Sequence, residues 1–322
     1  MLYRGRPVSL PHLLRYLYQE PCPAKLGGFA LSSSSLFPDG TPPLTGTVTR
    51  FAPSPTGDLH LGHAYSALFA SDLAARDGGT FLLRIEDIDV TRYRPEHEAA
   101  NLEDLRWLGL SWAEPVRRQS EHFDFYRTAL DLLEEMGLLY RCSLSRRELN
   151  EALSAPHGAP AESPTDTDKL LSEAERQRRL DSGAPFALRL RMERALERTG
   201  PLVWTDRQRG TQQARPEMFG DVVLARRDIP TSYHLAVTLD DALQGITLVT
   251  RGEDLLDATH VHRLLQALLG LPTPDYQHHG LLRDEDGNRL AKREQSIAIR
   301  DLRAAGHSAD EVCAMARKQG SD

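Results

Sequence analysis

Residues 47–89 decide the fold and read TVTRFAPSPTGDLHLGHAYSALFASDLAARDGGTFLLRIEDID. A short β-rich run ends at Pro53, and a loop with glycine and proline follows it. Apolar residues then recur about every third or fourth position up to Gly78 and Gly79, which predicts a helix. The compact apolar run after the glycines predicts a second strand that ends in acidic residues. Strand, glycine loop, helix and strand form the βαβ unit of a parallel sheet.

The flanking sequence continues this αβ pattern with an interruption. Helical periodicity marks residues 96–110 and 122–139, and FALRLRM at 186–192 alternates like a strand. We expect further strands in DVVLAR (221–226), SYHLAVTLDDAL (232–243) and GITLVTRGEDLL (245–256), and a helix over 258–270. The predicted fold class is α/β: a Rossmann-type parallel sheet with an inserted α+β subdomain. The expected divisions are 47–118 and 225–305 for the two halves of the sheet domain, 119–224 for the insertion and 306–322 for a C-terminal tail.

Composition excludes several classes of protein. The 322 residues are 40% hydrophobic and 26% charged, which is typical of a globular protein. The net charge of −7 argues against a generic nucleic-acid binder. No apolar run is long enough to span a membrane, and three scattered cysteines indicate a reducing, cytoplasmic compartment. Residues 1–46 are rich in proline and serine, so we expect a disordered extension or a misannotated start.

Three charged residues point to one site. Arg50, Glu86 and Arg251 each lie at the end of a predicted strand. Ligands of open parallel sheets bind beyond the carboxyl ends of the strands. Glu86 could hold an ammonium group and Arg251 a carboxylate, with Tyr233 as a further candidate. Taken singly, RIEDID could also be a charged strand end and RGED a solvated turn.

Two basic motifs are suited to phosphate. HLGH at 60–63 falls where a helix begins, and a helix N-terminus and histidine N–H groups favour phosphate oxygens. Two surface histidines are the alternative, whereas a metal site would need a third His or Cys ligand. RLAKR at 289–293 could close over a triphosphate, or it could be a hairpin that carries charge for solubility.

The order of these motifs resembles that of class I aminoacyl-tRNA synthetases, in particular the glutamyl branch. The resemblance covers residues 48–299. HLGH matches the "HIGH" signature of the class, and RLAKR looks like its "KMSKS" loop. Ala291 and Arg293 depart from that loop pattern.

The resemblance implies a role for each matching residue. ATP, with Mg²⁺, would be held by His60, Gly62, His63 and Lys292, of which His60, His63 and Lys292 would act in catalysis. L-glutamate would be bound by Arg50, Phe51, Ala52, Pro53, Ser54, Glu86, Tyr233 and Arg251.

The family's larger members continue into an anticodon-binding region, but only 30 residues follow Lys292 here (322 − 292). We therefore expect no anticodon-binding domain. The chain looks like the truncated branch, which activates glutamate and attaches it to the queuosine base in the anticodon of aspartate tRNA. A compact enzyme that charges glutamate tRNA and a non-catalytic paralogue are the alternatives. Glutamate, ATP and tRNA are the expected partners, with no membrane.

The insertion carries two further expectations. Truncated members often bind zinc through Cys-x-Cys, but here Cys142 is followed by Ser143 and Leu144, and His157 is the nearest further ligand. We therefore predict no metal site and no structural zinc. The arginines between residues 176 and 198 could contact RNA, or they could pair with glutamates on a solvated helix.

Overall fold

The computed structural model describes residues 46–145, 147–149, 167–281 and 297–319. Lys292 and His157, and nearly all of the expected extension at 1–46, lie outside these ranges. In the described ranges, no helix is both long and apolar enough to cross a membrane.

The first half of the catalytic domain is a three-stranded parallel sheet in the order β1-β2-β3. Its strands are β1 (Val48–Phe51), β2 (Thr80–Ile85) and β3 (Ala113–Arg118). Helix α2 (Leu61–Arg76) connects β1 to β2, and α3 (Pro95–Trp107) connects β2 to β3. The βαβ unit expected for residues 47–89 is thus confirmed.

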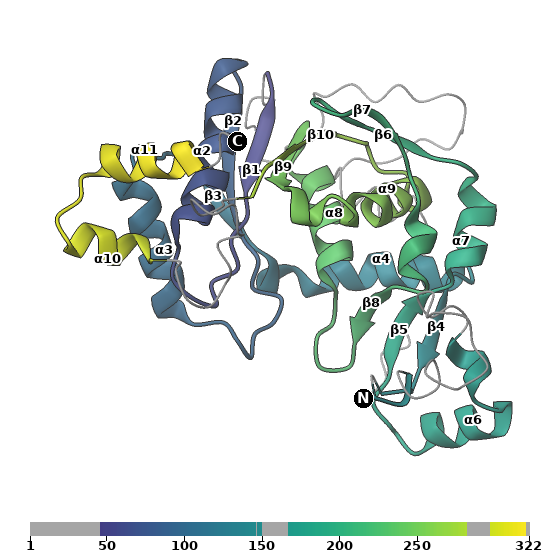
Figure 1. Ribbon diagram of the computed structural model, residues 1–322. Coiled ribbons are helices and arrows are strands. Elements are labelled where there is room, and N and C mark those ends of the chain that lie inside the picture. The colour runs from purple at the N-terminus through teal and green to yellow at the C-terminus, as the bar shows by residue number, and fades with distance from the viewer. Residues whose placement is uncertain (1–45, 146, 150–166, 282–296, 320–322) are drawn as a thin grey trace, which may run out of the picture.

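The second half is a four-stranded sheet in the order β7-β6-β10-β9. It contains β6 (Val203–Asp206), β7 (Gly210–Gln213), β9 (Leu248–Gly252) and β10 (Asp275–His279). Strands β6, β10 and β9 are parallel, and β7 is antiparallel to β6. The N–H of Thr247 donates to the carbonyl of Val48 at 3.0 Å. This bond brings β9 beside β1 and joins the halves (Figure 1).

Two helices of the second half lie close to its sheet, and the C-terminal helices cover the first half. Helix α8 (Tyr233–Leu243) precedes β9, and α9 (Ala258–Leu269) ends at Gly270, which has a left-handed φ of 66°. Helices α10 (Ile299–Ala304) and α11 (Ala309–Gln319) lie beside α2 and α3 (Figure 1). Val312 and Ala316 of α11 are fully buried in the same apolar core as α2, so residues expected as a tail form part of the catalytic fold.

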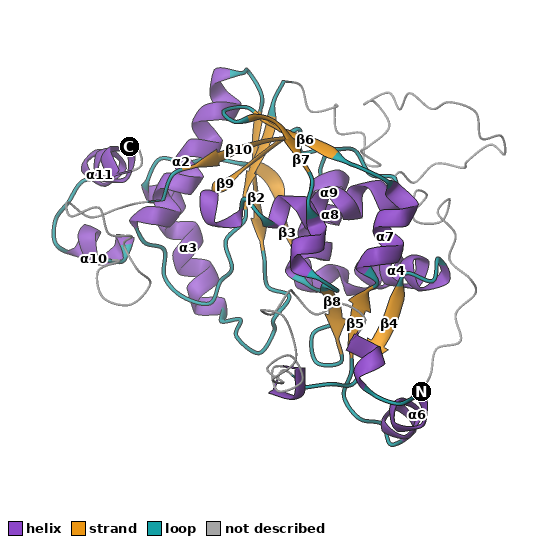
Figure 2. Cartoon of the chain, turned by 45° about the vertical axis from the view of Figure 1, so that its right-hand side comes forward, coloured by secondary structure: helices purple, strands orange, loops and turns teal. Residues whose placement is uncertain are grey.

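The insertion is an α+β unit below the catalytic sheet in Figure 2. Its antiparallel sheet has the order β4-β5-β8, built from β4 (Leu139–Cys142), β5 (Ala187–Leu190) and β8 (Val223–Arg226). Its helices are α4 (Phe123–Glu135), α6 (Glu173–Asp181) and α7 (Met192–Thr199). Short 3-10 turns lie at Gln119–His122, Thr167–Leu170, Pro216–Phe219 and Glu253–Leu255.

The structure also differs from the sequence-based expectation at α8 and at the bounds of the insertion. SYHLAVTLDDAL is helix α8, not a strand, because the Ser232 side chain caps it and burial around most of the helix hides any helical period. Strands β6 and β7 fall inside the range expected for the insertion, yet they extend the catalytic sheet. Strand β8 crosses the expected boundary at 224/225 and belongs to the insertion sheet. Sequence composition marks linkers, but it does not show which sheet a strand joins.

Candidate functional site

Arg50 lies near the carboxyl end of β1 and is 5% exposed. Its Nε and Nη2 donate to the two carboxylate oxygens of Asp241 at 2.9 and 3.2 Å, and its Nη1 donates to the Thr250 carbonyl at 3.1 Å. Asp241 raises the pKa of Arg50 above its ordinary value against the effect of burial. A guanidinium has five N–H groups, so this arrangement leaves one N–H on each terminal nitrogen for a ligand.

Glu86 immediately follows β2, and its N–H donates to the Pro53 carbonyl at 3.0 Å. This bond fixes the Arg50–Ser54 segment beside Glu86. The Glu86 side chain is 14% exposed, and its Oε1 lies 3.9 Å from Nη1 of Arg84. Burial raises the pKa of Glu86 to about 7, although Arg84 and Arg50 act against that rise. An ammonium group bound beside this carboxylate would favour its charged form and so lower its pKa.

Arg251 on β9 is buried and is surrounded by neutral partners. Its Nε donates to His278 Nε2 at 3.2 Å, and its Nη1 donates to His262 Nδ1 at 3.1 Å and to the Tyr233 hydroxyl at 3.4 Å. Nη2 donates to the Thr259 hydroxyl. Because both rings accept a hydrogen bond from Arg251, both are neutral here. Their pKa values are consistent with the neutral form. Burial and the charge of Arg251 lower the pKa of His278 to about 4 and that of His262 well below its ordinary value.

These side chains form one cluster. Glu86, Arg50 and Arg251 all act electrostatically on the Tyr233 hydroxyl, whose pKa is raised mainly by burial. The carboxyl ends of β1, β2 and β9 and the first residue of α8 therefore supply two guanidinium groups, one carboxylate and one phenol. That set complements a small molecule with two carboxylates and one ammonium group.

His60 and His63 form a reciprocal cap at the start of α2. Nδ1 of His60 accepts from the Gly62 N–H at 3.1 Å, and Nδ1 of His63 accepts from the His60 N–H at 3.3 Å. Each neutral ring then carries its proton on Nε2. The two rings are 3.8 Å apart between centroids, so two Nε2–H donors lie together at a helix N-terminus.

The remaining expected site residues differ in what they contribute. Phe51 is 8% exposed and packs in the α2 core, so its side chain has a structural role. Ser54 is exposed and Pro53 is buried. Ala298 forms an isolated β-bridge with His60, which brings the chain that follows residue 296 back to the helix start.

Sequence reasoning missed Asp241 and Arg84. Arg84 is fully buried; its Nη2 donates to Asp241 Oδ1 at 2.6 Å and its Nε to Gln244 Oε1 at 2.8 Å. The available signal was a lone arginine within an apolar strand, together with two adjacent aspartates that end an apolar run. Charges in such runs need buried partners.

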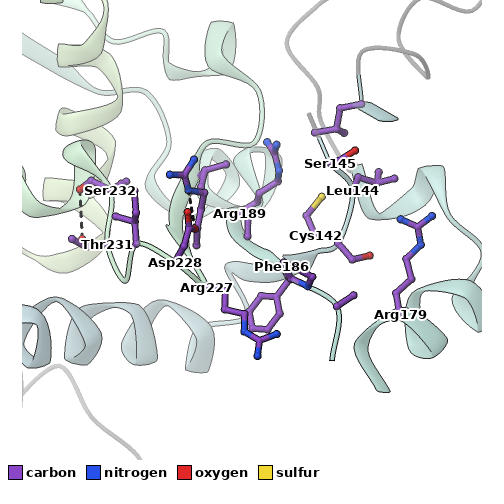
Figure 3. A pocket seen from close by; sticks show the side chains of 18 of the residues that line it. Cys142, Leu144, Ser145, Arg179, Phe186, Arg189, Arg227, Asp228, Thr231 and Ser232 are labelled. Atoms are coloured by element: carbon purple, nitrogen blue, oxygen red, sulfur yellow. Dashed lines mark hydrogen bonds and ion pairs between the residues drawn. The ribbon is translucent and has the colours of Figure 1, made fainter. Parts of the chain in front are cut away.

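A cavity of about 1240 Å³ separates the insertion sheet from the start of α8 (Figure 3). Arg189 and Arg227 line it together with Phe186 and Ser232, and Tyr233 of the polar cluster also reaches it. Tyr233 is thus the residue of the polar cluster that borders this cavity. Its other basic lining residues are Arg179 and Arg226.

Side chains around Cys142, where related proteins would have zinc ligands, form hydrogen bonds with one another. The Tyr140 hydroxyl donates to Asp221 Oδ2 at 2.7 Å, and the Thr167 hydroxyl donates to the buried Cys142 Sγ at 3.3 Å. In the described ranges, no group of three or more His, Cys, Asp or Glu side chains could hold a metal ion.

The arginines of α6 are paired with acidic residues. Arg178 lies within ion-pair distance of Glu175, and Arg179 pairs with Glu148 at 2.9 Å and with Glu175 at 3.0 Å. This pairing favours the solvated, charge-paired helix over an RNA-binding surface on α6.

Comparisons with known proteins identify the family of the chain. The family model "tRNA synthetases class I (E and Q), catalytic domain" matches residues 47–321. A protein of Rhodobacter capsulatus named glutamyl-Q tRNA(Asp) synthetase is 50% identical over 277 residues, which are 82% of this chain and 98% of that protein. A protein of the same name from Nocardia farcinica is 43% identical, over 85% of this chain and 84% of that protein.

Longer relatives match less of their own length. A glutamate–tRNA ligase of Aquifex aeolicus is 39% identical over 80% of this chain and 54% of that protein. The crystal structure of a glutamate tRNA ligase from Elizabethkingia meningosepticum, in complex with its amino acid, is 29% identical with a TM-score of 0.65. The match covers 81% of this chain and 53% of that one, so the chain spans about half the length of these ligases. By sequence and fold, the chain belongs to the class I tRNA synthetases of the glutamate and glutamine type.

Proposed function

We propose that this enzyme activates L-glutamate with ATP and transfers the glutamyl group to the queuosine base in the anticodon of tRNA(Asp). The observation that carries the amino-acid part is the cluster of Arg50, Glu86, Tyr233 and Arg251 at the carboxyl ends of the strands. The acceptor rests on the relatives named glutamyl-Q tRNA(Asp) synthetase, which are 41–50% identical to the chain. The relatives named glutamate–tRNA ligase are 37–40% identical.

Glutamate would be held by charge at each of its three ionic groups. Glu86 receives the ammonium group, and Arg50 and Arg251 receive the two carboxylates. The surroundings of the two arginines differ in charge. Arg50 forms an ion pair with Asp241, whereas the described partners of Arg251 are neutral. Tyr233 contacts Arg251 and closes the cluster toward the insertion cavity.

The residues at the α2 start fit ATP. Two Nε2–H donors and the helix N-terminus are suited to phosphate oxygens, and the cap geometry supports this proposed role. We propose that Lys292, which lies outside the described residues, contributes a further positive charge. Mg²⁺ would accompany ATP, bound largely through the phosphates.

The chemistry then needs positioning and charge stabilisation. A glutamate carboxylate oxygen attacks the α-phosphorus, the bond to pyrophosphate breaks and glutamyl-adenylate forms. His60 and His63 donate hydrogen bonds to phosphate oxygens as their negative charge grows. A hydroxyl of the acceptor next attacks the glutamyl carbonyl carbon and AMP leaves. We propose that this acceptor enters through the arginine-lined cavity and that the reaction takes place in the cytoplasm.

The test is transfer of labelled glutamate to three RNAs: tRNA(Asp) with queuosine, tRNA(Asp) without it, and tRNA(Glu). Labelling of the queuosine-bearing RNA alone is the expected result. Labelling of tRNA(Glu) would instead identify a compact protein-synthesis enzyme. No labelling, together with no glutamate-dependent pyrophosphate exchange into ATP, would identify a non-catalytic paralogue.

A further inference from the structure

Two consecutive aspartates near the end of α8 accept hydrogen bonds from side chains of several other elements. Asp240 is fully buried and accepts from Arg117 Nε of β3 at 2.8 Å and from the Tyr126 hydroxyl of α4 at 2.9 Å. Asp241 accepts instead from Arg50 of β1 and Arg84 of β2. Asp240 Oδ2 also lies 4.0 Å from Arg84 Nε, but of the two aspartates only Asp241 bonds to Arg50, which belongs to the proposed glutamate site.

The ion pair between Asp241 and Arg50 is bidentate. Two parallel N–H···O bonds fix the plane of a guanidinium as well as its position. With Nε and one edge of Nη2 committed to Asp241, the remaining N–H groups of Arg50 have one available direction. The carboxylate thus sets the orientation that a substrate carboxylate would meet.

Arg84 connects the same aspartate to Glu86. It is fully buried, and among the described residues its Nη1 has no hydrogen-bond partner. That nitrogen lies 3.9 Å from Glu86 Oε1. Burial without a partner is costly for a guanidinium N–H, so the position points to a role beside Glu86 and its ligand.

We propose that Asp241 and Arg84 are positioning residues for the substrate amino acid: Asp241 orients Arg50, and Arg84 supports the negative charge of Glu86. Neither residue needs to touch the substrate. The inference rests on the proposed function, because Arg50 and Glu86 are its glutamate ligands.

Asp241→Asn is the primary test, because it keeps the shape of the side chain and removes its charge. We expect the KM for glutamate to rise about tenfold or more and the KM for ATP to change less than about twofold. Both are measured in the transfer assay with saturating queuosine-bearing tRNA(Asp), and glutamate affinity is measured by calorimetry. Asp221→Asn is the matched control, since Asp221 is an equally buried hydrogen-bonded carboxylate in the insertion. It is expected to lower the melting temperature and to leave the KM for glutamate unchanged.

The pH profile of glutamate binding separates positioning from general stability. The charged groups that act on Glu86 are Arg84, Arg50, Asp241 and Asp240. Asp241→Asn removes a negative neighbour, so the midpoint of the profile should move to lower pH. A lysine at position 84 cannot contact Asp241, Gln244 and Glu86 together, so it should lower the pKa of Glu86 less than Arg84 does. The midpoint of the binding profile of Arg84→Lys should therefore move to higher pH. Shifts in opposite directions support the proposal.

Three results would overturn it. Folded Asp241→Asn protein with an unchanged KM for glutamate, or with equal rises for glutamate and ATP, would show a structural role only. If Asp241→Asn does not fold, an unshifted midpoint in Arg84→Lys has the same meaning. Folded wild-type protein that binds no glutamate would remove the proposed function itself, and that outcome is distinct from the first two.

Discussion

Arg50 and Arg251 are both buried, yet their surroundings differ in charge. Arg50 faces the Asp241 carboxylate, whereas Arg251 faces two neutral imidazoles, a phenol and a threonine hydroxyl. Asp206 accepts the Nδ1–H of His278 at 2.7 Å and so fixes the ring that accepts from Arg251. Because the described partners of Arg251 are all neutral, we expect Arg251 to attract an anionic group more strongly than Arg50 does.

Glu86 predicts the pH dependence of glutamate binding. Its pKa is raised to about 7 in the ligand-free site, so it is increasingly protonated as pH falls below that value. The substrate ammonium binds the ionised form, so the affinity should fall up to about tenfold per pH unit below that midpoint. Calorimetry between about pH 6 and about pH 8 measures this effect.

Glu86→Gln provides the control for that profile. It should bind more weakly at the upper pH and show no pH dependence across the range. His234 and His278 should not contribute, because burial and Arg251 lower the pKa of each to about 4. A slope that persists in Glu86→Gln would contradict the assignment.

His60 has two separable roles. Its Nδ1 caps α2, and its Nε2–H is proposed to meet phosphate. In His60→Asn an amide oxygen can still cap the helix, but the distal donor is lost. We expect kcat to fall about 100-fold with little change in melting temperature. His60→Ala should lose the cap as well, at a further cost of about 1 kcal/mol in the free energy of unfolding. Equal stability of the two variants would argue against the double role.

Most members of the polar cluster could be chosen from the sequence, because Arg50, Glu86, Tyr233 and Arg251 occur in motifs at element ends; their role in binding glutamate stays a prediction. Their partners could not be chosen in this way. Asp241 is 191 residues from Arg50, and only the folded sheet brings the two together. Local sequence shows that a buried charge needs a counter-charge, but it does not show which one.

At the level of elements, α8 supplies a candidate site residue at its start and buried aspartates at its end. Tyr233 is its first residue, and Asp240 and Asp241 lie in its last turn. The sequence predicts a strand here because eight of the eleven residues are buried and the polar ones do not mark one helix face. A helix buried on nearly all sides has no amphipathic period to detect. The Ser232 cap was the sequence signal that could have identified it.

Ser232→Ala tests the importance of that cap. Ser232 directly precedes Tyr233, and its hydroxyl accepts a hydrogen bond from the Leu235 N–H at 3.3 Å. Its loss should cost about 1 kcal/mol in the free energy of unfolding and raise the KM for glutamate. Ser172→Ala is the matched control, because Ser172 caps α6, which has no buried residues. Urea denaturation and steady-state kinetics measure both effects. A raised KM in the control variant would show that cap loss acts nonspecifically.

At the scale of the whole molecule, the C-terminal helix belongs to the catalytic core. Val312 is fully buried against α2, so Val312→Ala should lower the free energy of unfolding by about 2 kcal/mol. Urea denaturation measures the loss, and Ala314→Ser on the exposed face of α11 is the control. An unchanged midpoint for Val312→Ala would mean that α11 does not dock in solution.

We expect the stability of the protein to be unaffected by removal of metal ions, because of the hydrogen bonds inside the insertion. Tyr140, Thr167, Cys142 and Asp221 hold one another by hydrogen bonds. Dialysis against a chelator should therefore shift the melting temperature by less than about 1 °C. Stoichiometric zinc in the purified protein, with a large drop in melting temperature after chelation, would contradict this prediction.

The aspartate pair on α8 also bears on how the protein is synthesised. Arg50, Arg84 and Arg117 leave the ribosome long before Asp240 and Asp241 do. A nascent first half would have to bury three guanidinium groups without their carboxylates, which is strongly unfavourable. We therefore expect that half to remain open to chaperones during translation and to close only when α8 arrives.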